Sequence, residues 1–204
     1  MESKFNWNFE HGKNLFETAI DEFVEKGYDK ASINIILKNA GMSKGQFYYH
    51  FENKENLYFA LINELIAKKQ SFLGSRIKPE DMQQDIFSIF HLQIKLGMEF
   101  GKDYPTIYRF SEAFLREQGK PIYQKAMSKH NFENNDQIKT PIDMAYERGD
   151  FREDLPKTFI LKTVGYLFTK IPEISNVEGI EDVEAYLLHL IDFMRHGLAS
   201  KSNK

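Results

Sequence analysis

Apolar residues recur every three or four positions along most of the chain, whereas the strict alternation of a half-buried strand is hard to find. This spacing predicts an all-α protein. The Lys26-Gly27-Tyr28 segment predicts the end of the first helix, because a cation suits the last turn and glycine adopts the left-handed conformation that closes a helix. The apolar stripe of that helix consists of Phe16, Ala19, Ile20, Phe23 and Val24.

Three helical segments follow, and each begins after a residue that commonly caps helices. Ser32 is the predicted N-cap of a short helix that ends near Asn39, Ser43 of a third helix and Asn53 of a long fourth one. Gly41 supplies the permissive backbone for a tight turn between the second and third helices. The residues expected in the core of this helix-turn-helix are Phe23, Ile36, Ala40, Gly41, Phe47 and Phe51.

The rest of the chain is also helical but is interrupted more often. Gly74 and Pro79 break the pattern, and a helix over residues 82–100 is predicted beyond them. The two most apolar helices are expected at the end, near 157–171 and 181–198. The predicted domains are a helix-turn-helix domain at residues 1–54, a connecting fourth helix at 54–74, and a second helical domain at 75–204.

Composition narrows the class of protein. A chain of 204 residues with 42% hydrophobic and 28% charged residues resembles a soluble globular protein with an ample core. The absence of cysteine excludes disulfides, thiolate zinc sites and cysteine nucleophiles. No apolar run approaches the roughly 20 residues of a membrane-spanning helix, and the N-terminus lacks the apolar stretch of a secretory signal. These features predict a cytoplasmic location.

The third helix has an unusual set of side chains outside its core positions. They are cationic, amide or aromatic: Lys44, Gln46, Tyr48, Tyr49 and His50. From Lys26 to Lys54, five lysines face two acidic residues, so this segment carries a charge of +3 within a chain of net charge −3. Such a surface suits phosphates and base edges, and we therefore interpret this segment as the recognition helix of a DNA-binding protein.

Each candidate DNA contact has an ordinary alternative. Lys44 suits guanine O6/N7 or a phosphate, but a solvated lysine has the same sequence signature. Gln46 suits adenine N6/N7, or is merely exposed. Tyr48 and His50 have polar tips for phosphate oxygens, and Tyr49 suits a thymine methyl group. The predicted set is completed by Ser43, by Gly45 for close backbone approach, and by Lys54 as a phosphate anchor at a helix start.

Several of these segments together form a recognisable pattern. In chain order they are Leu15-Phe16, Ala19, Phe23, Gly27-Tyr28, Ala40-Gly41-Met42-Ser43-Lys44-Gly45, Phe47-Tyr48-Tyr49-His50-Phe51 and Asn53-Lys54-Glu55-Asn56-Leu57. In order, spacing and residue type, residues 13–65 resemble the DNA-binding domain of the TetR family of bacterial transcriptional regulators. Residues 147–156 also look like the segment that precedes the penultimate helix of that family. Ile35 and Leu37 depart from the family pattern, and both departures concern the geometry of the second helix rather than the presumed DNA face.

The resemblance implies an all-helical homodimer with an effector-binding C-terminal domain. The expected function is a repressor that a small molecule releases from a near-palindromic operator. In such a dimer the two apolar C-terminal helices would form a four-helix bundle with those of the partner. Their alternative role is simply the core of the body. The predicted interface residues are Phe159, Val164, Leu167, Phe168, Leu187, Leu190, Ile191 and Met194.

The aromatic residues of the body favour a pocket for a small apolar or aromatic effector, although each one taken singly also fits a plain helical core. The predicted lining is Phe90, Ile94, Met98, Tyr108, Phe114 and Tyr146. An effector-independent DNA-binding structural or interaction protein would use the same motif, and the sequence does not separate it from a ligand-responsive regulator.

Catalysis is not expected from this sequence. The six histidines include no pair at the i, i+4 spacing of a metal site, and no glycine-rich phosphate loop is present. Acidic residues such as Glu112 and Glu117 are interpreted as solvated. We therefore predict no enzyme activity, no cofactor and no metal. The expected partners are double-stranded DNA, a second copy of the chain and a small molecule, but not a membrane.

Overall fold

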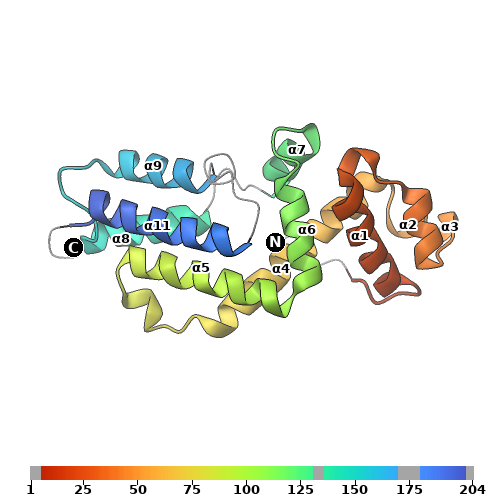
Figure 1. The fold of residues 1–204 in the computed structure, drawn as a ribbon, viewed down its shortest axis with the longest axis horizontal. Coiled ribbons are helices and arrows are strands. Elements are labelled where there is room, and N and C mark those ends of the chain that lie inside the picture. Colours follow the sequence, from red (N-terminus) through yellow and green to blue (C-terminus); the bar gives the residue numbers. More distant parts are fainter. Residues whose placement is uncertain (1–5, 131–135, 170–179, 201–204) are drawn as a thin grey trace. The chain divides into compact units, whose positions relative to one another are not determined.

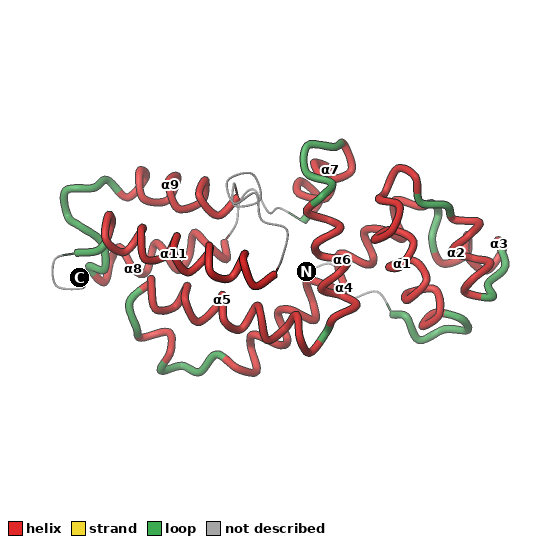
Figure 2. The backbone as a smooth tube through the Cα atoms, viewed as in Figure 1, coloured by secondary structure: helices red, strands yellow, loops and turns green. Residues whose placement is uncertain are grey.

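The computed structural model describes residues 6–130, 136–169 and 180–200, and over these ranges it contains helices but no strand (Figures 1 and 2). This confirms the all-α prediction. An isolated bridge pairs Phe151 with Ala199. The described helices are α1 (Gly12–Lys30), α2 (Ile33–Ala40), α3 (Lys44–His50), α4 (Lys54–Arg76), the 3₁₀ turn η1 (Asp81–Gln83), α5 (Ile86–Asp103), α6 (Pro105–Leu115), α7 (Pro121–Lys129), α8 (Asp136–Arg148), α9 (Lys157–Thr169) and α11 (Ile180–Leu198). None of them is long and apolar enough to cross a membrane.

The helices form two compact units whose residues do not follow chain order. The first unit comprises Met1–Phe72 and Phe100–His130, and the second comprises Leu73–Glu99 and Asn131–Lys204. Helix α5 therefore begins in the second unit, and its last turn belongs to the first. The assignment of separate functions to residues 1–54 and 75–204 stays a prediction.

The core of the first unit combines the N-terminal helices with α6 and α7. Tyr58 of α4 lies at its centre, because its ring makes edge contacts with Phe23 at 4.8 Å and with Phe110 at 5.4 Å between centroids. Such contacts between aromatic edges and faces add to the gain from burying the rings. The predicted core residues Phe23, Ile36, Ala40, Phe47 and Phe51 all lie in this cluster.

Local chemistry sets the helix ends in this unit. Gly41 has a φ of 69° and closes α2, as predicted, and the side chain of Asn53 accepts a hydrogen bond from the Asn56 N–H at 2.9 Å at the start of α4. The prediction for Ser32 is wrong in one respect. Ser32 occupies the N-cap position of α2, but its side chain makes no capping bond. Its backbone N–H instead donates to the buried Glu22 carboxylate at 2.9 Å.

The second unit is built around α5, α8, α9 and α11. Helix α5 begins at Ile86 rather than near residue 82 as predicted, because two carboxylates hold its first N–H groups. Asp85 accepts from the Phe87 N–H at 3.0 Å, and the buried Asp150 accepts from the Ile86 N–H at 2.8 Å. Residues 81–83 form the turn η1 instead. The predicted helix over 157–171 corresponds to α9, and its last two residues lie outside the described residues.

Candidate nucleic-acid interface

Helix α3 buries one side and exposes the other. Phe47 is 0% exposed and lies in the core cluster with residues of α1, α2 and α4, whereas Tyr48 is 57% and Tyr49 85% exposed. Lys44 and Gly45 are exposed as well, and a Cβ added at Gly45 would meet nothing within 4 Å. A seven-residue helix that presents a cation and two phenols to solvent has the surface that a DNA groove requires.

Gln46 is already engaged in the structure. Its Oε1 accepts the Ser43 N–H at 3.0 Å while the Ser43 hydroxyl accepts the Gln46 N–H at 3.2 Å, which is a capping box. Its Nε2 also lies 3.4 Å from a carboxylate oxygen of Glu10. Bidentate pairing with adenine needs both amide atoms, so it would require these bonds to open. The base contact of Gln46 therefore stays a prediction, and making it would break hydrogen bonds that the Gln46 amide forms in this structure.

His50 is held by the segment that precedes α1. Its ring stacks on Phe9 with 3.8 Å between centroids and 22° between planes, and it is half-buried. Trp7, in the same segment, packs against Phe16 at 5.0 Å and against Phe51 at 5.8 Å. Sequence reasoning missed this brace because two isolated aromatic residues in a polar segment show no helical period. The arrangement makes His50 a support for α3 as well as a candidate contact.

Lys54 has a role other than the predicted one. Its ammonium donates to the carbonyl oxygens of Tyr28, Asp29 and Ala31 at 2.7, 3.2 and 3.1 Å. It also lies 4.7 Å from the centroid of the Tyr28 ring. An ammonium group has three N–H donors, and all three are used here. These bonds leave no N–H of the Lys54 ammonium for a phosphate. They hold the start of α4 against the end of α1.

The expectation that Glu117 is solvated is wrong. Its side chain follows α6, is 2% exposed and accepts the backbone N–H of Tyr28 at 3.0 Å. Its other oxygen lies 2.7 Å from the Lys120 ammonium, and this hydrogen bond raises the pKa of Lys120. The partner amide lies 89 residues away in sequence, so no local pattern could have indicated the contact.

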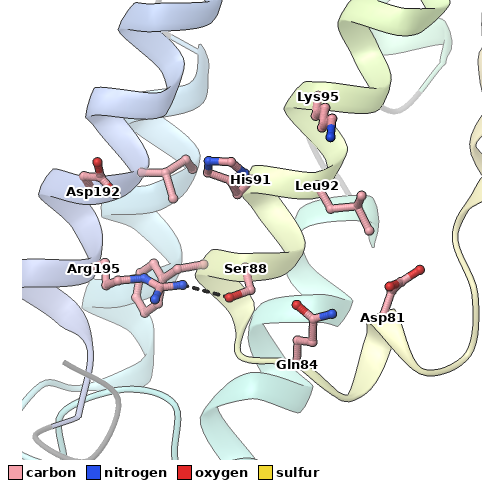
Figure 3. Close-up of a pocket in the computed structure, with 10 residues that line it drawn as sticks. Asp81, Gln84, Ser88, His91, Leu92, Lys95, Asp192 and Arg195 are labelled. Atoms are coloured by element: carbon pink, nitrogen blue, oxygen red, sulfur yellow. Dashed lines mark hydrogen bonds between the residues drawn. The ribbon is translucent and has the colours of Figure 1, made fainter.

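A pocket of about 450 Å³ lies in the second unit between α5 and α11 (Figure 3). None of the six predicted lining residues borders it. Tyr108 and Phe114 belong to the first unit, and Phe90 is buried in the core of the second. The lining consists of Asp81, Gln84, Phe87, Ser88, His91, Leu92, Lys95, Ile191, Asp192 and Arg195.

One end of this pocket is held rigidly. The Arg195 guanidinium donates to Ser88 Oγ at 2.9 Å (Figure 3). It also donates to Asp85 Oδ1 at 2.9 Å and lies 5.7 Å from the Phe87 ring centroid. Seven of the ten lining residues are polar or charged, so the pocket favours a ligand with polar groups over a purely apolar one.

Three of the eight predicted interface residues of the last two helices are core residues, and the other five stay predictions. Val164, Ile191 and Met194 are buried within the core of the second unit, so they have no surface left to bury against a partner. The exposed apolar side chains of α9 and α11 are instead Phe159, which was predicted, and Tyr166 and Phe193, which were not. Both helices are apolar on more than one side, and periodicity alone does not tell the core side from the exposed one.

Residues 15–61 match the family model of the bacterial regulatory proteins of the tetR family. Over 190 residues, 91% of this chain and 94% of the relative, the chain is 25% identical to the uncharacterized HTH-type transcriptional regulator YvdT of Bacillus subtilis (strain 168). It is 26% identical over 140 residues, 59% of this chain and 75% of the relative, to the biofilm operon icaADBC HTH-type negative transcriptional regulator IcaR of Staphylococcus aureus (strain Newman). The solved SmeT–triclosan complex has the same fold, with a TM-score of 0.72 and 17% identity over 94% of this chain and 93% of that one. Residues 15–61 therefore form the DNA-binding domain of the tetR family of bacterial regulatory proteins.

Proposed function

We propose that this transcriptional regulator is a homodimeric repressor that binds a near-palindromic operator through α3 and releases it when a small molecule binds. The observation that carries the proposal is the exposed face of α3, where Lys44, Tyr48 and Tyr49 project while Phe47 anchors the helix from behind. The negative regulator IcaR, similar over 59% of this chain, supports repression rather than activation. The triclosan complex of SmeT, which shares the fold, supports control by a small molecule.

The major groove, about 12 Å wide, accepts a helix such as α3. Lys44 at its first turn would meet a phosphate or a guanine edge, and the phenol groups of Tyr48 and Tyr49 would reach phosphate oxygens or a thymine methyl group. Gly45 offers no side chain to hold the backbone away from DNA. Because the Gln46 amide serves the capping box, base readout in this proposal rests first on Lys44 and Tyr49.

Lys44→Ala tests the DNA face. Each phosphate that a lysine neutralises releases counterions, so the DNA association constant falls as the salt concentration rises. Losing one such contact makes the negative slope of log K against log salt shallower by about 0.9. We expect this smaller slope in fluorescence anisotropy titrations of a duplex at several salt concentrations. Lys102→Ala, an exposed lysine in the last turn of α5, is the matched control and should keep the wild-type slope. A wild-type slope for Lys44→Ala would remove Lys44 from the interface.

A dimer is proposed because one short helix reads only a few base pairs. A two-fold dimer places two recognition helices about 34–36 Å apart, or a multiple of that distance, along the duplex. The exposed apolar residues Phe159, Tyr166 and Phe193 offer the surface that such a dimer would bury, with α9 and α11 of each copy forming a four-helix bundle.

Phe193→Asp is expected to abolish the dimer. Phe193 is 70% exposed, and a carboxylate buried at a two-fold interface would face its own copy without a cation to pair with. Light scattering at micromolar concentration should give twice the chain mass for the wild type and the single-chain mass for the variant. Asp192→Ala, a neighbouring exposed position on the same helix, should remain dimeric. A dimeric Phe193→Asp protein would place the interface elsewhere.

The pocket between α5 and α11 is the proposed effector site. Its volume of about 450 Å³ lies within the range of small-molecule sites, about 300–1,000 Å³. The lining carries charges of both signs, with the cations Lys95 and Arg195 and the anion Asp192. These charges favour an effector that has polar groups beside an apolar body, in place of the purely apolar or aromatic effector expected from composition. The effector would act by preferring a conformation that binds DNA poorly, to an extent limited by its difference in affinity for the two conformations.

A further inference from the structure

The segment between the break in α1 and the start of α2 is bonded on both sides by distant residues. On its N–H side, Glu117 accepts the Tyr28 amide at 3.0 Å. On its carbonyl side, Lys54 donates to Tyr28, Asp29 and Ala31. We propose that Glu117 and Lys54 are positioning residues for DNA binding, which clamp residues 27–31 and thereby fix the recognition helix α3 to α6. This inference rests on the proposed DNA-binding role of α3.

Gly27 makes the carboxylate side of this clamp possible. Its backbone has a φ of 71° and a ψ of 168°, a conformation that only glycine adopts readily. A Cβ at this position would lie 2.8 Å from Glu117 Oε1, which is closer than side-chain contacts allow. The backbone of α1 therefore opens where the Glu117 carboxylate arrives, and the Tyr28 N–H that leaves the α1 hydrogen-bond pattern is the one that Glu117 accepts.

The contact between Glu117 and the Tyr28 N–H is expected to contribute more to stability than the other polar contacts of this region with α1, because it is buried. Arg109 and Asp21 lie 3.5 Å apart and Arg116 reaches the Val24 carbonyl at 3.4 Å, but both contacts are exposed and such pairs contribute little. Glu117 is 2% exposed, and a buried carboxylate depends on its hydrogen bonds, which are stronger when charge-assisted. The nearby Tyr58 hydroxyl stays neutral, since burial and then the Glu117 charge raise its pKa.

The carbonyl side of the clamp leads directly to α3. Lys54 is the first residue of α4, and only residues 51–53 separate it from the last residue of α3. Anchoring the Lys54 ammonium on three carbonyl groups therefore fixes the point at which the chain leaves the recognition helix. A change in the position of residues 27–31 would change the direction of α3 relative to the rest of the first unit.

The N–H side of the clamp leads to α6 and from there to α5. A single residue, Tyr104, separates α5 from α6, and a Cβ at Gly101 would lie 2.8 Å from the Tyr108 ring, so the two helices pack closely at this corner. Helix α5 also carries five of the residues that line the pocket.

The test compares three changes at one position in the full-length protein. Glu117→Leu removes the acceptor, Glu117→Asp shortens it by one methylene group, and Glu117→Gln keeps an oxygen that accepts the Tyr28 N–H. Glu112→Leu, in the preceding helix α6, is the control. The readouts are hydrogen exchange of the Tyr28 amide well below the melting temperature and affinity for duplex DNA.

We expect Tyr28 exchange to become at least about tenfold faster and DNA affinity to fall at least about tenfold in the Leu and Asp variants, because a hydrogen bond to a charged group is lost. The Gln variant should have Tyr28 exchange and DNA affinity close to those of the wild type. Glu112→Leu should change neither the exchange rate nor the affinity. Combining Glu117→Leu with Lys54→Met should lower affinity by much less than the product of the two single losses, because both act on the same segment.

Wild-type exchange at Tyr28 in the Asp variant, or independent losses in the double variant, would overturn the proposal. If Glu117→Leu does not fold, Glu117→Asp and Glu117→Gln still compare a protein that loses the bond to the Tyr28 N–H with one that keeps it. The exchange readout does not depend on DNA. A wild-type protein without DNA affinity would therefore refute the proposed function, whereas an unchanged Tyr28 amide would refute the clamp.

Discussion

Phe47→Ala is expected to lower the free energy of unfolding by about 3–5 kcal/mol, the usual cost of deleting a fully buried aromatic ring. Phe47 is the buried residue of α3, and its ring stacks 5.5 Å from that of Phe51. Helix α3 has seven residues, too few to be stable without tertiary contacts. Since small domains are stable by about 5–15 kcal/mol in total, the loss should abolish a large part of the folded population at physiological temperature.

Urea denaturation followed by circular dichroism measures this loss. Tyr49→Ala, two positions further along the same helix, is the matched control, because an 85% exposed side chain contributes little to stability. Its unfolding midpoint should remain near the wild-type value while its DNA affinity falls. Equal midpoints for Phe47→Ala and the wild type would mean that α3 is not anchored as described.

Gly27→Ala is the second large effect that we expect. Holding a non-glycine residue in the conformation of Gly27 costs about 1–3 kcal/mol, and the added methyl group also displaces the Glu117 carboxylate from the Tyr28 amide. DNA affinity should fall together with stability, because the displaced segment holds Lys54 as well. Thermal unfolding and DNA titration of the same preparation provide the two measurements.

Gly74→Ala provides the contrast for this prediction. Gly74 lies in α4 with nothing within 4 Å of an added Cβ, so alanine should stabilise the protein by about 0.5–1 kcal/mol. A Gly27→Ala protein as stable as Gly74→Ala would show that residues 27–31 relax freely and that the contact with Glu117 has no structural consequence.

The parts of the fold that sequence reasoning predicted correctly depend on neighbours in the chain. The turn at Gly41, the cap at Asn53 and the capping role of Ser43 each involve residues at most five positions apart, and residue type reflects them directly. At Gly27, where the sequence predicted the end of the first helix, the structure has a break inside α1, which continues to Lys30. The helix-turn-helix was therefore predictable almost entirely from local chemistry.

The errors concern partners that are far away in the sequence. The Ser32 N–H donates to Glu22 ten residues earlier, Lys54 bonds to carbonyl groups 23–26 residues earlier, and Glu117 bonds to an amide 89 residues away. An exposed polar residue and a buried, fully bonded one have the same letter in the sequence, and only the tertiary structure separates them. The same reason explains why Phe193 was missed and Ile191 misassigned on one apolar helix.

In vitro selection from a random-sequence duplex library with the purified wild-type protein tests most directly whether α3 reads a two-fold site on DNA. The predicted result is enrichment of one near-palindromic sequence whose half-sites lie about 10–10.5 base pairs apart, or a multiple of that, between their centres. Tyr49→Ala should enrich the same sequence more weakly or lose it. A wild-type library indistinguishable from the starting pool at moderate salt would contradict the account.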